Sequence, residues 1–201
     1  MTFIKYLPGA TPLDPNEIAG LIPSYITTQG ELDTHEQSGI LEAQVWATSK
    51  NHKDILTEQF AKNLHQRMFK SLWRWAGQFR NSDKSIGVPW PQVAVELKKL
   101  MGDADYWIAN KIYPMDELAA RLHYRLVFIH PFPNGNGRWA RLMTDIFLNH
   151  HEQPVFSWGA AGSENTADEI GRAGTTREKY IQALQAADQK NFKLLIEFVR
   201  S

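Results

Sequence analysis

One stretch of the sequence places a titratable ring, two glycines and two cations close together. It runs from residue 130 to residue 141 and reads His-Pro-Phe-Pro-Asn-Gly-Asn-Gly-Arg-Trp-Ala-Arg. Glycines let backbone N–H groups approach an anion closely, and a helix that begins just after them points its unsatisfied N–H groups at the same place. Arg138 and Arg141 would lie on one face of that helix and add two charged forks. The combination predicts phosphate chemistry.

Each part of this stretch suggests a separate task. His130 is the candidate base for an attacking hydroxyl, and its place at a helix end within apolar surroundings predicts titration near neutrality. The backbone from Gly135 to Gly137 would stabilise charge on phosphate oxygens. A divalent cation would normally bridge the phosphates, but the stretch has no carboxylate, and Asn134 is its nearest oxygen donor. Taken singly, the histidine is better explained as a helix-end residue and the glycines as a turn; only the whole string favours a site.

Two apolar-periodic segments flank the stretch and must position it. A helix is predicted over 115–129, introduced by Pro114 and two acids and ended by Pro131. A second helix is predicted over 138–149, with an apolar stripe wide enough to make it central. The histidine would then lie at the end of one helix and both arginines at the start of the next.

The remaining pattern is also mostly helical. Residues 1–23 hold four prolines and predict an extended arm with one turn at Asn16 to Gly20. Residues 152–176 predict a long irregular connection. His65, beside a core stripe, is expected to be a partly exposed helical histidine. Residues 81–91 fit either a β-hairpin or an extended loop, whose edge either accepts a peptide by strand addition or is plain surface. Further helices are predicted over 28–47, 51–69, 93–108, 177–187 and 192–200.

Composition limits the classes of protein and partner. The 201 residues are 43% hydrophobic and 22% charged, as in an ordinary globular domain. Lys+Arg and Asp+Glu both number 22, so we expect no broad electrostatic hold on nucleic acid. The absence of cysteine excludes disulfides and thiolate chemistry. No secretion signal and no membrane-spanning window is visible, which predicts a cytoplasmic protein without membrane contact.

The central string is similar to the signature of the Fic (filamentation induced by cyclic AMP) family, H-x-F-x-[D/E]-G-N-G-R-x-x-R. Every fixed position matches except that Asn134 stands where the family has an acid. The run from Trp75 to Arg80, followed by Ile86 and Gly87, resembles the family's entry into its hairpin flap. With the opening from Pro8 to Asp14, the chain most resembles the Fic subgroup called mobile mystery protein B.

This resemblance implies a mainly α protein, a Fic-type helical bundle with a short β-hairpin flap. It implies an N-terminal arm over 1–27 and a single Fic domain over 28–201, with a core at about 52–150. The implied activity is protein adenylylation, which moves AMP from ATP to a Ser, Thr or Tyr hydroxyl of a target protein with Mg²⁺ or Mn²⁺.

Roles follow position by position from the same resemblance. His130 would be the base, Phe132 the core anchor of the loop, and Asn134 a weak metal ligand in place of the acid. The implied phosphate-binding residues are Gly135, Asn136, Gly137, Arg138 and Arg141, and the implied target-docking flap is Ile86, Gly87 and Val88. The alternative is a nucleotide-binding regulatory module of the same fold with weak or no transfer, because Asn134 replaces a charged ligand. Transfer of phosphate or phosphocholine fits the retained glycines and arginines less well.

The resemblance further implies autoinhibition and partners. Fic proteins often carry a helix with [S/T]-x-x-x-E-[G/N], whose glutamate pairs with the second motif arginine and excludes the γ phosphate. Ser38 and Glu42 match this pattern, although Ala43 stands where Gly or Asn is expected, and they predict an inhibitory helix at about 36–48. The alternative for Glu42 is a solvated surface acid. The family also suggests a helix-turn-helix companion protein and allows a homodimer.

Overall fold

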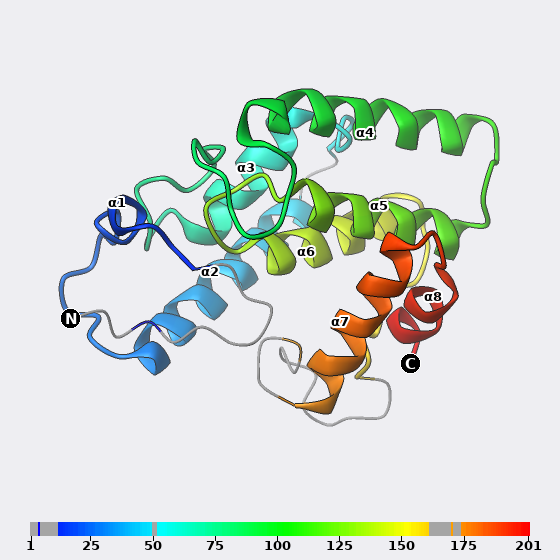
Figure 1. Cartoon of the computed structure of the whole chain (residues 1–201). Helices are drawn as coiled ribbons and strands as arrows, with labels where there is room; N and C mark the ends of the chain where they lie inside the picture. The colour runs from blue at the N-terminus through cyan, green and yellow to red at the C-terminus, as the bar shows by residue number, and fades with distance from the viewer. Residues whose placement is uncertain (1–3, 5–11, 50–51, 161–169, 171–173) are drawn as a thin grey trace.

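The computed structural model of the chain is mainly helical (Figure 1). It describes residues 4, 12–49, 52–160, 170 and 174–201. The helices in these residues are α1 (Pro15–Ile18), α2 (Gln29–Ser49), α3 (Glu58–Phe69), the short 3-10 helix η1 (Trp90–Gln92), α4 (Val93–Ala109), α5 (Met115–Ile129), α6 (Asn136–His150), α7 (Thr175–Asp188) and α8 (Lys193–Val199). Within this described part, every helix is too short or too polar to serve as a transmembrane segment.

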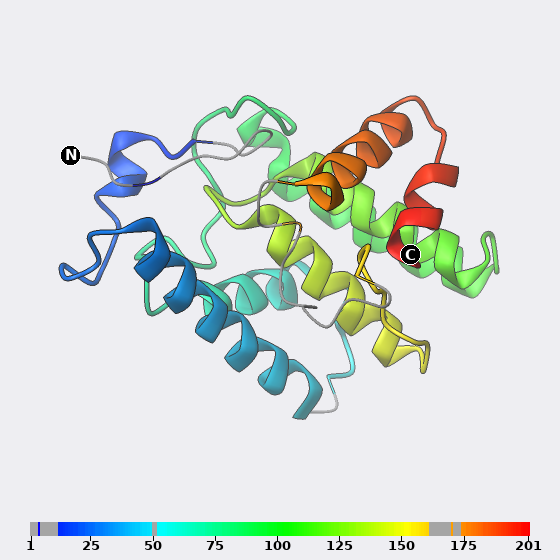
Figure 2. The same ribbon diagram turned by 90° about the horizontal axis from the view of Figure 1, so that it is seen from below.

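Helices α5 and α6 form the centre of the molecule, and helices α2, α3, α4 and α8 pack on this pair. Helix α4 packs on α5 and helix α3 on α6, as Figure 1 shows. Helix α2 lies along α3 and also contacts α6, which the view from below makes clear (Figure 2). Helices α7 and α8 pack on each other, and α8 contacts α5. The loop between α5 and α6 is therefore held by elements from most of the chain.

Local sequence explains why the central pair is interrupted where it is. Helix α5 follows Pro114 and has Asp116 and Glu117 in its first turn, where negative charge favours a helix start. It ends at His130, which adopts the left-handed conformation at φ 52° just before Pro131. The helix predicted over 115–129 is confirmed. The second helix begins at Asn136, two residues before the predicted start.

Large apolar side chains from both central helices and the loop between them are fully buried. Each such side chain stabilises the fold by roughly 1.5–3 kcal/mol relative to exposure. The residues with at most 2% exposure in this region include Leu118, Leu122, Leu126, Ile129, Phe132, Trp139, Met143 and Phe147. The loop between α5 and α6 is consequently part of the hydrophobic core and is not a surface loop.

The expected β-hairpin is absent, because the described residues contain no strand and residues 80–89 form an irregular loop. An isolated antiparallel bridge joins Leu21 and Trp73 elsewhere in the described chain. The loop's carbonyl groups are used differently from those of a hairpin. Arg80 donates from Nη1 to Ser82 O at 2.9 Å and from Nη2 to Val88 O. A buried guanidinium thus replaces the cross-strand amides that a hairpin would need.

The described part of the N-terminal arm contains the predicted turn, as the single-turn helix α1 and the turn residues that follow it. Asp14 is the N-cap of helix α1, and its backbone N–H donates to the Glu17 carboxylate at 2.7 Å as part of a capping box. Part of the Pro8–Asp14 opening lies outside the described residues, as does much of the predicted connection over 152–176.

Candidate active site

His130 is held by its backbone at the junction of α5 and the loop. Arg80 Nε donates to His130 O at 2.6 Å, and the Arg80 N–H donates to Pro131 O at 3.0 Å. These bonds support a left-handed backbone that non-glycine residues adopt infrequently. The His130 residue is 7% exposed, and its Nδ1 is buried.

Burial decides the protonation of His130. It lowers the pKa of this side chain to about 4, and the positive charge of Arg80 acts in the same direction. The Lys84 charge lowers this pKa further, while a hydrogen bond to the Val127 backbone opposes the shift. The predicted titration near neutrality is therefore wrong, because desolvation outweighs the field of the helix end. At pH 7 the ring is neutral and able to accept a proton.

The loop after His130 is closed by its own side chains. Asn136 Oδ1 accepts from Phe132 N at 2.9 Å, and Asn136 Nδ2 donates to Phe132 O at 2.7 Å. The Phe132 ring is fully buried and stacks on His65 with centroids 3.7 Å apart. Phe132 thus lies where a core anchor is expected. The side chain of Asn136 is used inside the loop, which leaves its backbone N–H at the start of α6 for an anion.

The two glycines of the loop have different reasons to be glycine. Gly135 has φ +77°, and a Cβ there would lie 2.6 Å from the Phe69 ring, so backbone and packing both require glycine. A Cβ at Gly137 would meet only Arg141 Nη1, at 3.9 Å. Protein packing therefore does not explain Gly137, since alanine is favoured in a helix by about 1 kcal/mol. The space left open adjoins the first turn of α6, where an anion would bind.

The first arginine of the string is already paired with a carboxylate. Glu36, on α2, forms a two-pronged ion pair with Arg138, in which Arg138 Nη2 donates to Glu36 Oε1 at 3.2 Å. Glu36 is only 5% exposed. The close approach of α2 explains this burial, because a Cβ at Gly39 would lie 2.1 Å from Met68 O. Glycine at position 39 therefore lets α2 bring its glutamate to the loop.

The second arginine belongs to a buried polar cluster that the sequence did not indicate. Arg141 bonds the Tyr180 side chain on α7, and the Tyr180 hydroxyl lies 2.9 Å from His123 Nε2 on α5. Burial lowers the pKa of His123 to about 3, and Arg141 adds to this shift. Burial also raises the pKa of Asp145 to about 7, although hydrogen bonds such as that from Trp158 Nε1 at 3.0 Å oppose the change. Helix α7 thereby helps to orient Arg141.

The structure does not bring the predicted inhibitory residues to the loop. Ser38 and Glu42 are exposed on α2, and no described contact joins Glu42 to the loop. The glutamate that meets an arginine is Glu36, six residues earlier. A signal for it was present in the sequence, because it shares a helical stripe with the other buried residues of α2, which are Leu32, Gly39, Ala43 and Ala47.

The irregular loop over 80–89 crosses directly above His130. Gly87 has φ +108°, and a Cβ there would lie 2.8 Å from His130 Cβ and 2.9 Å from Arg80 Nη2. Val88 is buried at 9% exposure, whereas Ile86 is 45% exposed. Of the three predicted flap residues, Gly87 thus lies beside the candidate base, and Ile86 and Val88 are its neighbours in a segment that forms no strand.

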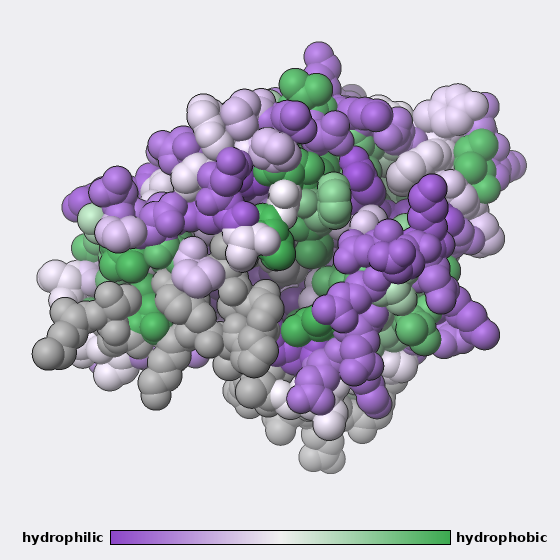
Figure 3. All heavy atoms as spheres, in the orientation of Figure 1, coloured by the Kyte–Doolittle hydropathy of each residue, from purple (hydrophilic) through white to green (hydrophobic). Residues whose placement is uncertain are grey.

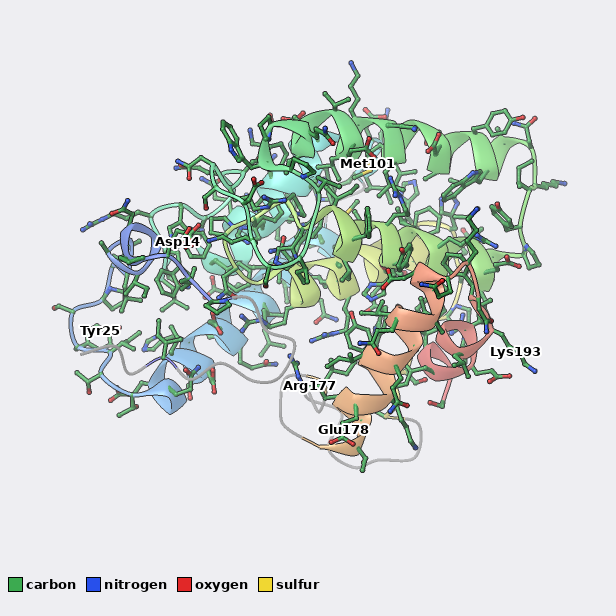
Figure 4. All side chains as sticks on the ribbon, viewed as in Figure 1. Asp14, Tyr25, Met101, Arg177, Glu178 and Lys193 are labelled. Atoms are coloured by element: carbon green, nitrogen blue, oxygen red, sulfur yellow. The ribbon has the colours of Figure 1, made fainter. Side chains whose placement is uncertain are left out.

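Helix α1 anchors this loop from its other side. The Lys84 side chain is 2% exposed, and its Nζ donates to Glu17 Oε2 at 2.6 Å and to Asp14 Oδ2 at 2.8 Å. Asp14, labelled in Figure 4, lies between α1 and the loop. Figure 3 shows the same face of the molecule, where apolar surface is exposed below α4 and polar side chains surround it.

The site offers little to a metal ion by itself. Among the described residues, no group of three or more His, Asp or Glu side chains could hold a metal. Asn134 Oδ1 accepts from the Gly135 N–H, so the expected neutral ligand is engaged within the loop. A bound Mg²⁺ would take most of its oxygens from phosphates and water, as this ion commonly does.

Comparisons with known proteins agree on the domain type. Residues 55–148 match the family model described as the Fic/DOC family. The chain is 27% identical over 175 residues to the protein adenylyltransferase Fic of Aedes aegypti, which covers 84% of this chain and 32% of that protein. It is 38% identical over 77 residues to the protein of the same name from Nematostella vectensis, and this match covers 36% of this chain and 18% of that protein. The chain thus spans about a third of the length of the first relative.

Solved structures show the same fold. Fic-1 (residues 134–508) of C. elegans superposes with a TM-score of 0.66 at 20% identity, covering 90% of this chain and 51% of that one. BepC, a VirB-translocated effector of Bartonella tribocorum solved with bound AMPPNP, superposes with a TM-score of 0.61 at 17% identity. The superposition covers 93% of this chain and 97% of that one. The likeness at these identities establishes the mainly helical Fic fold.

Proposed function

Because residues 55–148 form a Fic/DOC family domain, we propose that this chain is a protein adenylyltransferase that moves AMP from ATP to a Ser, Thr or Tyr hydroxyl of a target protein. The observation that carries this proposal is a buried neutral His130 close in the chain to the open first turn of α6 at Gly137. The candidate base and the candidate anion site therefore belong to the same short loop between α5 and α6. The name of the Aedes aegypti relative and the AMPPNP bound to BepC support ATP as the substrate.

The reaction needs one nucleophilic substitution at phosphorus. The target hydroxyl oxygen attacks the α-phosphorus, and the bond from that phosphorus to the oxygen bridging to the β-phosphate breaks, so pyrophosphate leaves. His130 takes the hydroxyl proton, and the negative triphosphate beside it favours the imidazolium that forms. The amides of Gly135 to Gly137 and the guanidinium of Arg141 stabilise charge on the phosphate oxygens. A bound Mg²⁺ or Mn²⁺, with Asn134 as a neutral ligand, would neutralise part of that charge.

The loop over 86–88 is proposed to dock the target. Its position above His130 supports this role, because a peptide held there would bring its hydroxyl to the base. The exposed Ile86 offers apolar contact. A target segment in extended form would add to the loop by backbone hydrogen bonds.

Autoinhibition is proposed to act through Glu36 rather than through the predicted Glu42. The Glu36 carboxylate occupies both prongs of Arg138 and so competes with a phosphate for the same fork. Release requires α2 to move or Glu36 to be replaced. Glu42 faces solvent, in agreement with its alternative reading as a surface acid.

A nucleotide-binding module with weak or no transfer is the second candidate, and Asn134 is the observation that favours it. Incubating the protein and its His130→Ala variant with α-³²P-labelled ATP, Mg²⁺ or Mn²⁺ and cell extract separates the two. Label that appears on protein only when His130 is present supports the enzyme. ATP binding without label transfer supports the module, and parallel reactions with the other labelled nucleoside triphosphates report the base preference.

Several finer features stay predictions from the sequence and its resemblance. They are the mobile mystery protein B subgroup, the domain limits at 28 and 201, the helix-turn-helix companion, the homodimer and the cytoplasmic location.

A further inference from the structure

A buried histidine links two segments on either side of the candidate site. His65, on α3, has no exposed surface and lies between the turn at Gly77 and the loop at Asn134. The Gly77 N–H donates to His65 Nδ1 at 3.0 Å, and His65 Nε2 lies 3.0 Å from Asn134 O. Its ring stacks on Phe132. The expectation that His65 is partly exposed is therefore wrong, since α3 turns it toward the loop.

The two contacts define the tautomer of this ring. A backbone N–H can only donate, so His65 Nδ1 must carry a lone pair and no proton. The Asn134 carbonyl can only accept, so Nε2 must carry the proton. Both ring nitrogens are then satisfied in the neutral form, and burial lowers the pKa of His65 to about 3. A proton on Nδ1 would remove its lone pair and so break the hydrogen bond that the Gly77 N–H donates.

The bond to the loop has a consequence for the peptide between residues 134 and 135. This unit is planar, so fixing the direction of Asn134 O also fixes the direction of the Gly135 N–H. That N–H begins the candidate anion cradle and meets Asn134 Oδ1. The side chain of Asn136 ties the loop only at Phe132. Asn134 Oδ1 holds the N–H end of this peptide from within the loop, whereas His65 holds its carbonyl end from α3, outside the loop.

We propose that His65 is a positioning residue that, as the Nε2–H tautomer held by Gly77, orients the 134–135 peptide and so preorganises the phosphate-binding amides. It acts through Asn134 and does not touch the nucleotide. The bond at Gly77 also joins the cradle to the segment that leads into the loop above His130. This inference rests on the proposed function only for the ligand that the amides bind.

A pair of amide variants separates the two hydrogen bonds. His65→Gln places its amide nitrogen near the original Nε2 and keeps the donor to Asn134 O. His65→Asn places its amide oxygen near the original Nδ1 and keeps only the acceptor for Gly77. Both variants lose the ring that stacks on Phe132, so they are matched in lost packing. Thermal melting of both variants, compared with that of the wild-type chain, checks that they are folded.

The binding readout is the dissociation constant of ATP and of inorganic tripolyphosphate, measured by calorimetry. We expect His65→Asn to bind both about three- to tenfold more weakly than His65→Gln, as the loss of one buried hydrogen bond predicts. Equal affinities for the two variants, or weaker binding by His65→Gln, would overturn the proposal.

Two NMR measurements test the positioning without any ligand. Ring ¹⁵N shifts at pH 7 should show Nε2 protonated and Nδ1 bare, with the His65 signals identified by their loss in His65→Gln. The Gly135 amide peak should shift in His65→Asn and stay near its wild-type position in His65→Gln. An Nδ1–H tautomer, or a Gly135 peak that moves equally in both variants, contradicts the inference. If wild-type protein binds no nucleotide, the proposed function fails, while these measurements still decide the role of His65.

Discussion

Glu36 and Arg138 form a two-pronged ion pair that joins α2 to the first turn of α6. The pair connects residues far apart in the sequence, and its carboxylate side chain is only 7% exposed. It places a negative group where the proposed reaction would place a phosphate. The state of this pair should therefore control access of ATP to Arg138.

Replacing Glu36 should activate the protein. In Glu36→Gln, Arg138 no longer faces a charged competitor, and we expect ATP turnover or self-adenylylation to rise by about 5- to 150-fold, the usual range of a coupling between two sites. The measurement is incorporation of label from α-³²P-labelled ATP. Glu42→Gln is the matched control, because it makes the same change on the exposed face of α2 and should leave the rate unchanged. Equal rates in all three proteins would exclude inhibition by Glu36.

The two loop glycines should respond in opposite ways to alanine. Gly137→Ala should raise the free energy of unfolding by about 0.5–1 kcal/mol, because its Cβ meets no protein atom closer than 3.9 Å, while ATP binding weakens. Gly135→Ala should lower stability by at least about 1 kcal/mol, since φ is positive and the Phe69 ring is in the way. Urea unfolding and calorimetry give both quantities. Unchanged ATP binding in a stabilised Gly137→Ala would show that the open space is not the phosphate site.

The buried histidines should make folding stability strongly pH-dependent. The folded-state pKa is about 3 for His65 and His123 and about 4 for His130, below the ordinary 6.5, so the unfolded chain binds more protons between these values. Their stabilisation is complete above pH 6.5 and is lost as the pH falls toward 4 and then 3. Asp145, with its pKa raised to about 7, acts oppositely between 3.8 and 7.

The net difference is about two protons between pH 4 and 6, which predicts a slope of about 2–3 kcal/mol per pH unit with stability rising as pH rises. Urea unfolding at a series of pH values measures it. His65→Gln should reduce the slope by about 1.4 kcal/mol per pH unit. A flat profile would mean that these rings are protonated in the folded protein.

Arg80 should matter for transfer more than for ATP binding. Its guanidinium joins His130 O to the carbonyls of the loop over 82–88, and lysine cannot make these bonds at once. In Arg80→Lys we expect kcat/KM for the target to fall by about tenfold to a hundredfold, because small misplacement of the base is costly. The Kd for ATP should change by less than about threefold, since the proposed phosphate site lies at the first turn of α6 and not at Arg80.

The control for Arg80 is Asp83→Asn, which removes an exposed charge 3.7 Å from Arg80 and keeps an acceptor for the Trp90 N–H. It should leave both constants unchanged. Thermal melting verifies that Arg80→Lys is folded. An equal loss of ATP affinity and transfer would mean that Arg80 supports the whole loop rather than the base and the target-docking segment.

Local signals in the sequence determined the central part of the fold. Apolar periodicity and proline punctuation predicted α5 at its observed limits, and the string over 130–141 predicted where base, glycines and arginines lie. Such features depend on neighbours within a few residues, so they can be read along the chain. Element ends were less accurate, because α3 begins at Glu58 behind its Thr57 cap rather than at residue 51.

Only the tertiary structure decided which groups are buried and paired. The face of α2 that meets the loop is chosen by the close contact between Gly39 and Met68 O, which selects Glu36 over Glu42. The Arg80 guanidinium donates hydrogen bonds to the Ser82 and Val88 carbonyls, which cross-strand amides would bind in a hairpin. Packing by distant segments lowers the pKa of His130. Burial and pairing are sums over residues far apart in the chain, so the type and local spacing of a residue do not determine them.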